Sequence, residues 1–317
     1  MGVRVFVDGH AGTTGLRIRE WLSRRDDLDL ITLSDAERKD AAARRRALEE
    51  ADLAVLCLPD EAAREAAAWA EQAGTRIVDA STAHRTDERF VYGLPELAPG
   101  QREAIRRAPR VSNPGCYPTG FLLLVRPLVD AGLLARRAPL AVHAVSGYSG
   151  GGRPLVGRWE DPALGLASLP FEAPYALERV HKHVPEMMRH AGLETEPFFL
   201  PAVGPFRCGM RVQVPVPADL LPPGAAARVP ELLRERYAAE PFVRVFEGPP
   251  GGEVPERALD PRACNDTNRV DLYVVVHPSG HLLLVALLDN LGKGASGAAI
   301  QNLNLMLGLP ESTGLPT

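Results

Sequence analysis

Lysine is scarce in this chain of 317 residues. Of its 36 basic residues only Lys39, Lys182 and Lys293 are lysines, and the others are arginines. Acidic residues number 40, so the formal net charge is −4 and there is no positive excess of the kind that binds nucleic acid or an anionic membrane. Apolar runs are short as well, and none approaches the ~18 residues that a membrane-spanning helix requires. We therefore expect neither a nucleic-acid partner nor a membrane span.

Cysteine is also rare, and its four copies are far apart. Cys57, Cys116, Cys208 and Cys264 form no CxxC pair, which argues against a zinc site or a disulfide scaffold and suits the reducing cytoplasm. We expect no bound metal. The opening "MGVRVFVDGH" does not read as a signal peptide, because its apolar stretch is short and contains an aspartate.

The length and the hydrophobic pattern predict two domains. Strands are expected over 3–8, 28–33, 51–58 and 75–80, alternating with helices over 14–25, 40–50 and 61–74. This is the pattern of an α/β domain with a Rossmann-type, doubly wound parallel sheet. Beyond about residue 135, Pro and Gly cluster and strands such as 210–216 and 270–277 lack regular crossover helices, which predicts an α+β domain with a mixed sheet. A last helix is expected over 292–308. We expect one domain from 1–117 plus 291–317 and a second from 118–290.

A glycine-rich turn follows the first predicted strand. Gly9, Gly12 and Gly15 form GxxGxxG, where a tight turn lets a pyrophosphate approach the N-terminus of the next helix. The spacing differs from the dinucleotide fingerprint GxGxxG, but its place between strand and helix favours a nucleotide cofactor over a merely structural turn. The hydroxyls of Thr13 and Thr14 are candidate phosphate ligands.

The residues after the second predicted strand indicate which nicotinamide cofactor binds. An acidic residue there favours NAD and basic residues favour NADP. Asp35 argues for NAD, whereas Ser34, Arg38 and Lys39 offer three donors to a 2′-phosphate. We predict NADP(H) as the cofactor, against the alternative that the stretch is a solvated loop.

Cys116 lies in "SNPGCYPTG", just ahead of the apolar stretch 119–130. Pro118 suits a first helical turn, although Pro127 is expected to shorten or kink the helix. A cysteine at a helix N-terminus is stabilised as a thiolate, and the nearby amides can hold an oxyanion. We predict that Cys116 is a nucleophile, and that the other three cysteines only pack.

A nucleophilic thiol needs a group that exchanges protons, and "HKHVPE" supplies two candidates. The stretch before Pro185 is expected to be extended, which would place His181 and His183 on one face and Lys182 on the other. A short helix is expected to follow and to end near Gly192. The sequence does not distinguish which histidine is the acid and base.

These features resemble the N-acetyl-γ-glutamyl-phosphate reductase family, relatives of aspartate-semialdehyde dehydrogenase, in its shorter form. The resemblance covers nearly the whole chain and is carried by "GHAGTTG", "DASTAHR", "VYGLPEL", "SNPGCYPTG", "SGYSGGGR", "HKHVPE" and "DNLGKGASGAAIQNLN". The chain departs from the family at two points. It has Gly where the family has Ala in SGxSGAGR, and its glycine turn differs from the commoner GASGYTG while keeping all three glycines.

The resemblance implies that Cys116 attacks an acyl phosphate, expels inorganic phosphate and forms a thioester that NADPH reduces to a semialdehyde. It further implies a homodimer or homotetramer, and it adds site residues. Asn290 and Lys293 are the cofactor candidates from the last motif. The candidates for the anionic substrate are Arg85, Asn113, Ser149, Arg153 and Lys182. Placement near the cofactor and the catalytic histidines would explain why the three lysines persist.

Five other functions are consistent with parts of the pattern. Aspartate-semialdehyde and glyceraldehyde-phosphate dehydrogenases share the thioester chemistry, but "VYGLPEL" and "NPGCYPT" speak against both. A reductase of carrier-linked aminoadipyl phosphate in lysine biosynthesis is closer. A Cys-His acyl hydrolase would not need the glycine turn. A non-catalytic NADP-binding regulator would not need Cys116.

Overall fold

The structure is a computed structural model that describes residues 2–10, 12–165, 168–178, 180–248 and 259–317. The chain divides into two units. Unit 1 consists of Met1–Gly115 and Ala295–Pro316, and unit 2 of Cys116–Gly294 together with Thr317. The chain thus passes between the units after Gly115 and again after Gly294. Within the described residues no helix is long and apolar enough to cross a membrane, and no group of three or more His, Cys, Asp or Glu side chains is arranged to hold a metal ion.

Unit 1 is built on a parallel sheet of six strands. The strand order is β2-β1-β3-β4-β6-β5, and every neighbouring pair is parallel. The strands are β1 (Val3–Asp8), β2 (Leu28–Ile31), β3 (Leu53–Leu56), β4 (Arg76–Asp79), β5 (Val91–Tyr92) and β6 (Arg110–Ser112). The helices are α1 (Thr13–Leu22), α2 (Ala41–Glu50), α3 (Asp60–Ala73), α4 (Gln101–Arg107) and α9 (Gly297–Met306), with a short 3₁₀ helix, η1 (Glu37–Lys39).

Strand order and right-handed crossovers place helices on both faces of this sheet. The chain leaves β1 through α1 towards β2, and then returns across the sheet through α2 and α3. Consistent with this, α2 packs on α3, whereas α1 packs on α9. The sheet is therefore doubly wound, as the alternation of apolar runs and helical periodicity predicted.

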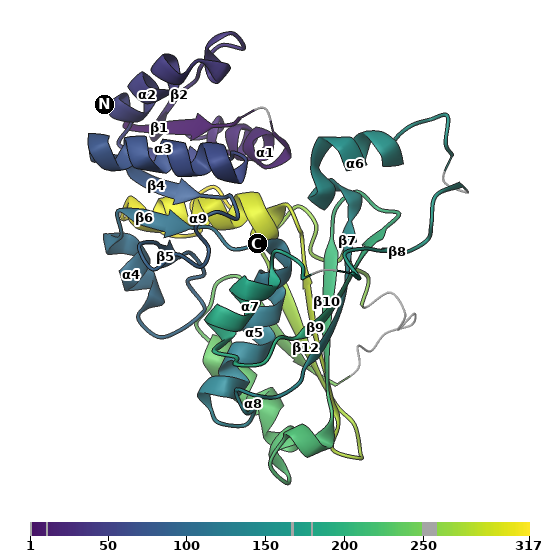
Figure 1. Ribbon diagram of the computed structural model, residues 1–317. Helices are drawn as coiled ribbons and strands as arrows, with labels where there is room; N and C mark the ends of the chain where they lie inside the picture. The colour runs from purple at the N-terminus through teal and green to yellow at the C-terminus, as the bar shows by residue number, and fades with distance from the viewer. Residues whose placement is uncertain (1, 11, 166–167, 179, 249–258) are drawn as a thin grey trace. The chain divides into compact units, whose positions relative to one another are not determined.

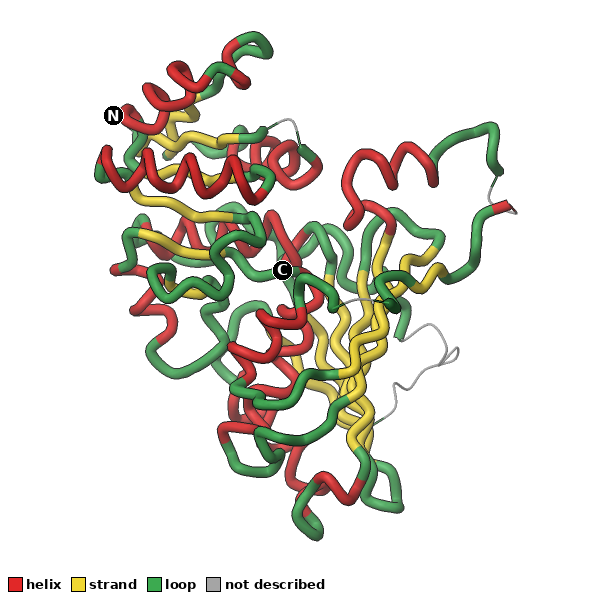
Figure 2. Tube along the Cα trace, viewed as in Figure 1, coloured by secondary structure: helices red, strands yellow, loops and turns green. Residues whose placement is uncertain are grey.

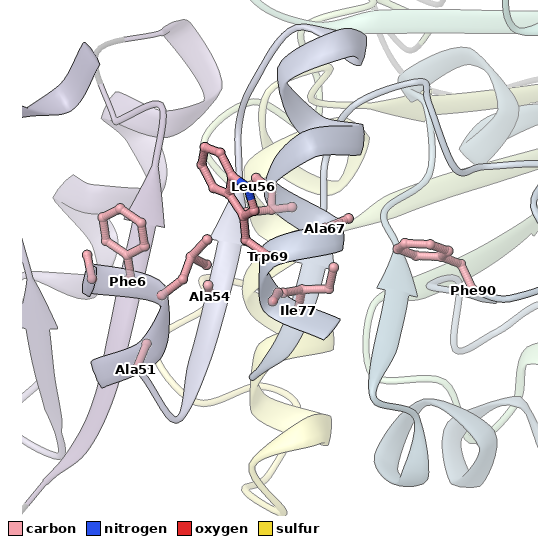
Figure 3. Close-up of a cluster of buried hydrophobic side chains, with 12 residues drawn as sticks. Phe6, Ala51, Ala54, Leu56, Ala67, Trp69, Ile77 and Phe90 are labelled. Atoms are coloured by element: carbon pink, nitrogen blue, oxygen red, sulfur yellow. The ribbon is translucent and has the colours of Figure 1, made fainter. Parts of the chain in front are cut away.

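The core beneath α3 explains its alanine-rich sequence. Ala66, Ala67 and Ala70 are buried against Ile77 of β4 and neighbouring strands, and Trp69 fills the remaining space (Figure 3). Small side chains let the helix approach the sheet closely, and the helix ends at Gly74, whose φ of 75° suits a residue without a Cβ.

Unit 2 is built on a mixed sheet of seven strands in the order β11-β12-β13-β10-β7-β9-β8. The strands are β7 (Ala141–Gly147), β8 (Ala173–Pro174), β9 (Phe198–Gly204), β10 (Met210–Val216), β11 (Val243–Glu247), β12 (Val270–Val276) and β13 (Leu282–Leu288). The pairs β7–β9 and β11–β12 are parallel, and the other pairs are antiparallel. The longer strands stand together in Figure 2. A mixed sheet was the prediction for this part of the chain.

Helices cover one face of the unit 2 sheet. In Figure 1, α5 (Cys116–Asp130), α7 (Val184–Ala191) and α8 (Val229–Tyr237) lie together against its strands, and α5 is packed on β10 and β13. A fourth helix, α6 (Gly152–Trp159), follows the 3₁₀ helix η2 (Tyr148–Gly151). Two short 3₁₀ helices, η4 (Ala218–Leu220) and η5 (Ala225–Arg228), precede α8, and a π-helical turn, η7 (Gly292–Ser296), precedes α9.

The helix that begins at Cys116 is longer than predicted. It starts three residues before the expected Thr119, and Pro127 does not shorten it. Proline has no N–H, so the carbonyl of Leu123 loses its partner in the helix. The hydroxyl of Tyr237, at the end of α8, donates to that carbonyl over 2.7 Å. The expectation of a shortened helix was wrong because this replacement comes from a residue 114 positions away.

We predict that Tyr237→Phe lowers the free energy of unfolding by about 1–3 kcal/mol, because it leaves a buried carbonyl without a donor. In a Pro127→Ala background a new backbone amide at position 127 can donate to Leu123, so the same change should cost less than about 1 kcal/mol. Urea denaturation of the four proteins in this double-mutant cycle measures the difference. An equal cost in both backgrounds would show that the hydroxyl does not replace the missing amide.

Candidate active site

The glycine turn lies in unit 1 between β1 and α1, as predicted. Gly9 has a φ of 84°, and the amide of Gly12 donates to the carbonyl of Gly9 over 3.0 Å. A Cβ on Gly15 would come within 2.5 Å of that same carbonyl, so Gly15 is required for the turn to pack on the helix. The N-cap of α1 is Gly12, which supplies no side-chain acceptor. The first amides of α1 therefore have no capping side chain, a geometry that suits a pyrophosphate.

The terminal motif comes back to this turn. Ser296, at the end of η7, donates from its Oγ to the carbonyl of Thr14 over 3.2 Å. Thr13 and Thr14 are the first two residues of α1. Residues almost three hundred positions apart are thus joined in unit 1 at the predicted cofactor turn.

The loop after β2 carries its predicted cofactor residues in an unforeseen arrangement. Ser34 and Glu37 form a capping box: the amide of Ser34 donates to Glu37 Oε2 over 3.1 Å, and the amide of Glu37 donates back to Ser34 Oγ over 3.3 Å. Arg38 pairs with Asp35 over 2.9 Å. Lys39 is exposed. The sequence signal that was missed is the spacing S-x-x-E in "SDAE".

Cys116 is the first residue of α5 in unit 2. Gly294 packs closely on it: a Cβ on Gly294 would lie 2.8 Å from the Cβ of Cys116, so only glycine allows the turn of η7 to pass so close. The other cysteines contrast with it. Burial raises the pKa of Cys57, with Asp79 and Asp8 adding to the effect, and burial raises the pKa of Cys264 to about 12. Those two thiols stay protonated and inert, as predicted.

The two histidines of "HKHVPE" lie side by side, but not on an extended strand. The expectation of an extended stretch was wrong, because residues 181–184 form a turn in which Val184 donates to the carbonyl of His181 over 2.9 Å. His183 is the N-cap of α7 in a helical conformation. Pro185 in the first turn lacks only an amide that would have no helical partner, so the helix can begin before it. The two imidazole centroids are 4.8 Å apart.

His181 is fixed in one tautomer by its hydrogen bonds. Its Nδ1 accepts from the backbone amide of His183 over 3.1 Å, so the neutral ring carries its proton on Nε2. That atom is 3.3 Å from the hydroxyl of Tyr175, which in turn donates to the hydroxyl of Tyr117 over 3.4 Å. Tyr117 donates to the carbonyl of Ala202 over 3.3 Å. The hydrogen bonds therefore run in one direction, from the imidazole to a backbone carbonyl.

These rings form an aromatic cage that we define as Tyr117, Tyr175, His181, His183 and Phe199. Burial raises the pKa of Tyr175 to about 12, and a negative charge on Cys116 acts in the same direction. Burial also raises the pKa of Tyr117, to which Tyr175 and Cys116 contribute. Both hydroxyls therefore remain proton donors, within electrostatic reach of the Cys116 sulfur. Sequence reasoning missed both tyrosines, although Tyr117 directly follows the cysteine.

The other predicted site residues fall into two groups. Arg85, Asn113, Ser149, Asn290 and Lys293 are buried, whereas Arg153 and Lys182 are exposed. In unit 2 the amide of Asn290 donates to Ser149 Oγ over 3.0 Å and its oxygen accepts from the amide of Gly209 over 2.8 Å. Lys293 is fully covered, with Nζ 5.7 Å from the centre of the Phe242 ring. Their predicted roles stay predictions.

We predict that Tyr175→Phe shifts the signal of His181 Nε2 without changing the tautomer, because Nε2–H loses its acceptor while Nδ1 still accepts from the amide of His183. Nitrogen NMR of the imidazole measures this. The wild-type ring should report the Nε2–H form throughout pH 8–10, since Tyr175 keeps its proton until the pH rises towards 12. The variant should keep the Nε2–H form but with a shifted Nε2 signal, because the amide of His183 still donates to Nδ1. Tyr148→Phe is the control, because its hydroxyl contacts Glu160 instead. An unchanged His181 signal in Tyr175→Phe would contradict the assignment.

Comparison with known proteins accounts for both units. Residues 4–108 match the family model described as semialdehyde dehydrogenase, NAD binding domain, and residues 116–290 match semialdehyde dehydrogenase, dimerisation domain. The chain is similar to aspartate semialdehyde dehydrogenase II of Vibrio cholerae, with a TM-score of 0.74 at 19% identity over 97% of this chain and 99% of that one. That likeness concerns the fold alone.

Sequence relatives are much closer. N-acetyl-gamma-glutamyl-phosphate reductase of Trichormus variabilis is 48% identical over 98% of this chain and 99% of its own length. The protein of the same name from Burkholderia orbicola is 50% identical over 96% of this chain and 97% of its own. The chain therefore belongs to the N-acetyl-gamma-glutamyl-phosphate reductase family, within the semialdehyde dehydrogenases.

Proposed function

We propose that this chain reduces N-acetyl-L-glutamyl 5-phosphate to N-acetyl-L-glutamate 5-semialdehyde with NADPH, the reaction that the names of its relatives describe and a step of arginine biosynthesis. The observation that carries the proposal is the position of Cys116 as the first residue of α5, followed by a tyrosine of the aromatic cage. A thiol at a helix N-terminus, beside imidazoles, is suited to nucleophilic attack on an acyl group.

The first step forms a thioester. The thiolate sulfur of Cys116 attacks the carbonyl carbon of the acyl phosphate, the bond from that carbon to the phosphate oxygen breaks, and inorganic phosphate leaves with the electron pair. The backbone amides at the start of α5 stabilise the negative charge that develops on the carbonyl oxygen. The product is an acyl group bound to Cys116, which accepts hydride far more readily than a carboxylate does.

The second step returns the thiol. Bound NADPH supplies the hydride to the thioester carbon. The carbonyl oxygen gains a proton, and the carbon–sulfur bond then breaks to give the aldehyde and the Cys116 thiolate, with the proton returned to the acid–base group. We assign that group to His183, because both ring nitrogens of His181 are already used by His183 N–H and Tyr175. His181 orients its neighbour, and the tyrosines steady His181.

Charged and polar groups are assigned to the anionic substrate. Arg153 on α6 and Lys182 are exposed cations of unit 2, and Ser149 of η2 belongs to the same motif as Arg153. Arg85 is the candidate from unit 1, whereas Asn113, the other residue predicted there, is buried and already hydrogen-bonded through its backbone and its side chain. Asn290 and Lys293 are the candidates of the terminal motif for the cofactor. Arginine and lysine are the residues that bind phosphate and carboxylate groups most strongly.

We assign the pyrophosphate of the cofactor to unit 1 and the nucleophile to unit 2. The uncapped amides of α1 fit a pyrophosphate, and the matched NAD-binding model covers the same turn. NADP is the proposed form, because Arg38 and Lys39 offer positive charge after β2. Binding of a 2′-phosphate there has to compete with Asp35 for Arg38 and with Glu37 for Ser34.

The assembly that we propose is a homodimer or homotetramer formed through unit 2. It rests on the match of residues 116–290 to a dimerisation domain. The inorganic phosphate released in the first step is a substrate of the reverse reaction, so the enzyme can be assayed in either direction.

We predict that Lys39→Ala raises the KM for NADPH about tenfold and leaves the KM for NADH unchanged, since a charge-assisted contact to the 2′-phosphate is lost. Glu37→Gln should lower the KM for NADPH, because it weakens the competitor for Ser34. Steady-state kinetics with both cofactors measure the ratio. Arg24→Ala, which removes an exposed cation paired with Glu20 on α1, is the control. Equal losses with NADH and NADPH would contradict NADP selectivity at this loop.

We predict that Cys116→Ser abolishes phosphate-dependent formation of NADPH from N-acetylglutamate semialdehyde and NADP, with a loss of more than about a thousandfold in kcat. The assay follows absorbance of the reduced cofactor with and without phosphate. Cys264→Ala, a buried cysteine of unit 2, should keep the activity. If the wild type binds NADP but shows no turnover, the substrate is an aminoadipyl or aspartyl phosphate instead, and the same assay with the corresponding semialdehyde tests this.

A further inference from the structure

The segment that leads to the nucleophile is held by Asn113, whose polar groups are all used within unit 1. Its amide N–H donates to the carbonyl of Asp79 over 2.7 Å, and its carbonyl accepts from Arg85 Nε over 3.0 Å. Its side-chain Nδ2 donates to the carbonyl of Ala295 over 3.0 Å, and its Oδ1 accepts from Asn302 over 3.2 Å. Asn113 is 1% exposed. These hydrogen bonds hold both the backbone and the side chain of Asn113 in one position.

Asn302, a buried residue of α9, makes two hydrogen bonds through its side-chain amide group. Nδ2 donates to the carbonyl of Gly93 over 2.8 Å and to Asn113 Oδ1 over 3.2 Å. The oxygen Oδ1 has no hydrogen-bond partner in the described part of the chain, and the residue is fully buried. An unpaired buried oxygen is costly, so a residue kept only to fill this space would be apolar. The two donated bonds are what distinguish Asn302 from a leucine.

Gly93 of "VYGLPEL" has no side chain, which leaves room for the side-chain amide of Asn302. A Cβ on Gly93 would lie 2.4 Å from Asn302 Nδ2, a distance that no side chain at this position can meet without moving the asparagine. The amide of Gly93 also donates to the carbonyl of Ser112 over 2.8 Å. Gly93 therefore contacts both Asn302 and the strand that runs into the nucleophile segment.

We propose that Asn302 is a positioning residue for Cys116. It ties Asn113, three residues before Cys116, to the carbonyl of Gly93 and so fixes the segment from which the chain enters α5. The proposal rests on the proposed function, because it assigns to Cys116 the role of nucleophile. It gives Asn113 a positioning role as well, since its side chain is committed to Asn302 and Ala295.

The chain contains a matched control two residues away. Asn304 is on the same helix, is also fully buried, and also donates through Nδ2 to two oxygens, the carbonyls of Glu311 and Thr313. Those carbonyls belong to the C-terminal segment and not to the nucleophile segment. Asn302→Ala and Asn304→Ala therefore each remove two donated hydrogen bonds from the same helix, and Asn304→Ala also removes an acceptor of Arg25. Only Asn302→Ala affects the segment that leads to Cys116.

The test compares three readouts in these two variants: the Tm, the kcat with the KM values, and the rate at which iodoacetamide alkylates Cys116 across a range of pH. We expect both variants to lower the Tm. Asn302→Ala should lower kcat about tenfold to a hundredfold, with the KM for NADP within twofold, and should move the pH midpoint of alkylation, because a displaced thiol leaves its site at the helix N-terminus. Asn304→Ala should leave kcat and the alkylation profile within twofold of wild type.

Gly93→Ala supplies an independent variant that keeps the asparagine. It should reproduce the kcat loss and the shifted alkylation profile. In the double variant Gly93→Ala with Asn302→Ala the clash at 2.4 Å with Asn302 Nδ2 is gone and only that at 2.8 Å with Val111 Cγ1 remains, so the two losses should be less than additive. Asn302→Asp, which keeps the size of the side chain, replaces Asn302→Ala should that variant not fold.

The outcomes separate the two levels of the proposal. If the wild type turns over and Asn302→Ala matches Asn304→Ala in kcat and in alkylation, the positioning role is refuted and the proposed function stands. If the wild type shows no phosphate-dependent turnover, the proposed function fails, and the alkylation profile alone still decides whether Asn302 positions Cys116. Additive losses in the double variant would overturn the contact between Gly93 and Asn302 as the cause.

Discussion

The last helix can lie inside unit 1 only because each of its buried amide side chains is hydrogen-bonded. Gln301, Asn302 and Asn304 are fully buried on α9, where an amide without a partner would cost more than an apolar residue of the same size. Gln301 donates to the carboxylates of Glu96 and Glu311, and Asn304 donates to the chain that follows the helix. These bonds specify one position for α9, and that position in turn holds together segments that are some two hundred residues apart in the chain.

The two passages of the chain between the units coincide with the chemistry that we assign. The first passage places Cys116 at the start of α5, and the second ends at Gly294, whose backbone packs on the Cβ of Cys116 within unit 2. Glycine is needed at the second passage because the contact leaves no room for a side chain. The nucleophile is thus confined by its own unit through Gly294, while the residues immediately before it are confined by unit 1 through Asn113. On each side of this passage the chain is therefore held by contacts within its own unit, as a reactive group that needs precise placement requires.

Local patterns predicted those parts of the fold that depend on neighbouring residues. The apolar run of β1 and the alternation of strands and helices identified the parallel sheet, and Gly74 and Gly192 both end helices as expected. The failures have distant causes. The carbonyl freed by Pro127 is satisfied by a tyrosine on another helix, and the amides of α9 bind carboxylates and carbonyls that no spacing in the sequence connects to them. The capping box of Ser34 and Glu37 was not predicted for a different reason. Its spacing is local, but the basic residues beside Ser34 favoured a phosphate ligand instead.

The turn at residues 181–184 shows why the two histidines of one motif need not be equivalent. On an extended strand both imidazoles would point the same way with similar surroundings, and nothing would separate their roles. In the turn, the amide of His183 reaches back to Nδ1 of His181, which commits one ring nitrogen, and Tyr175 commits the other. The same turn makes His183 the N-cap of α7 and brings its ring against Tyr117, the residue after the nucleophile. The asymmetry arises from backbone geometry, so a histidine fixed in one tautomer supports a second that is assigned to exchange protons.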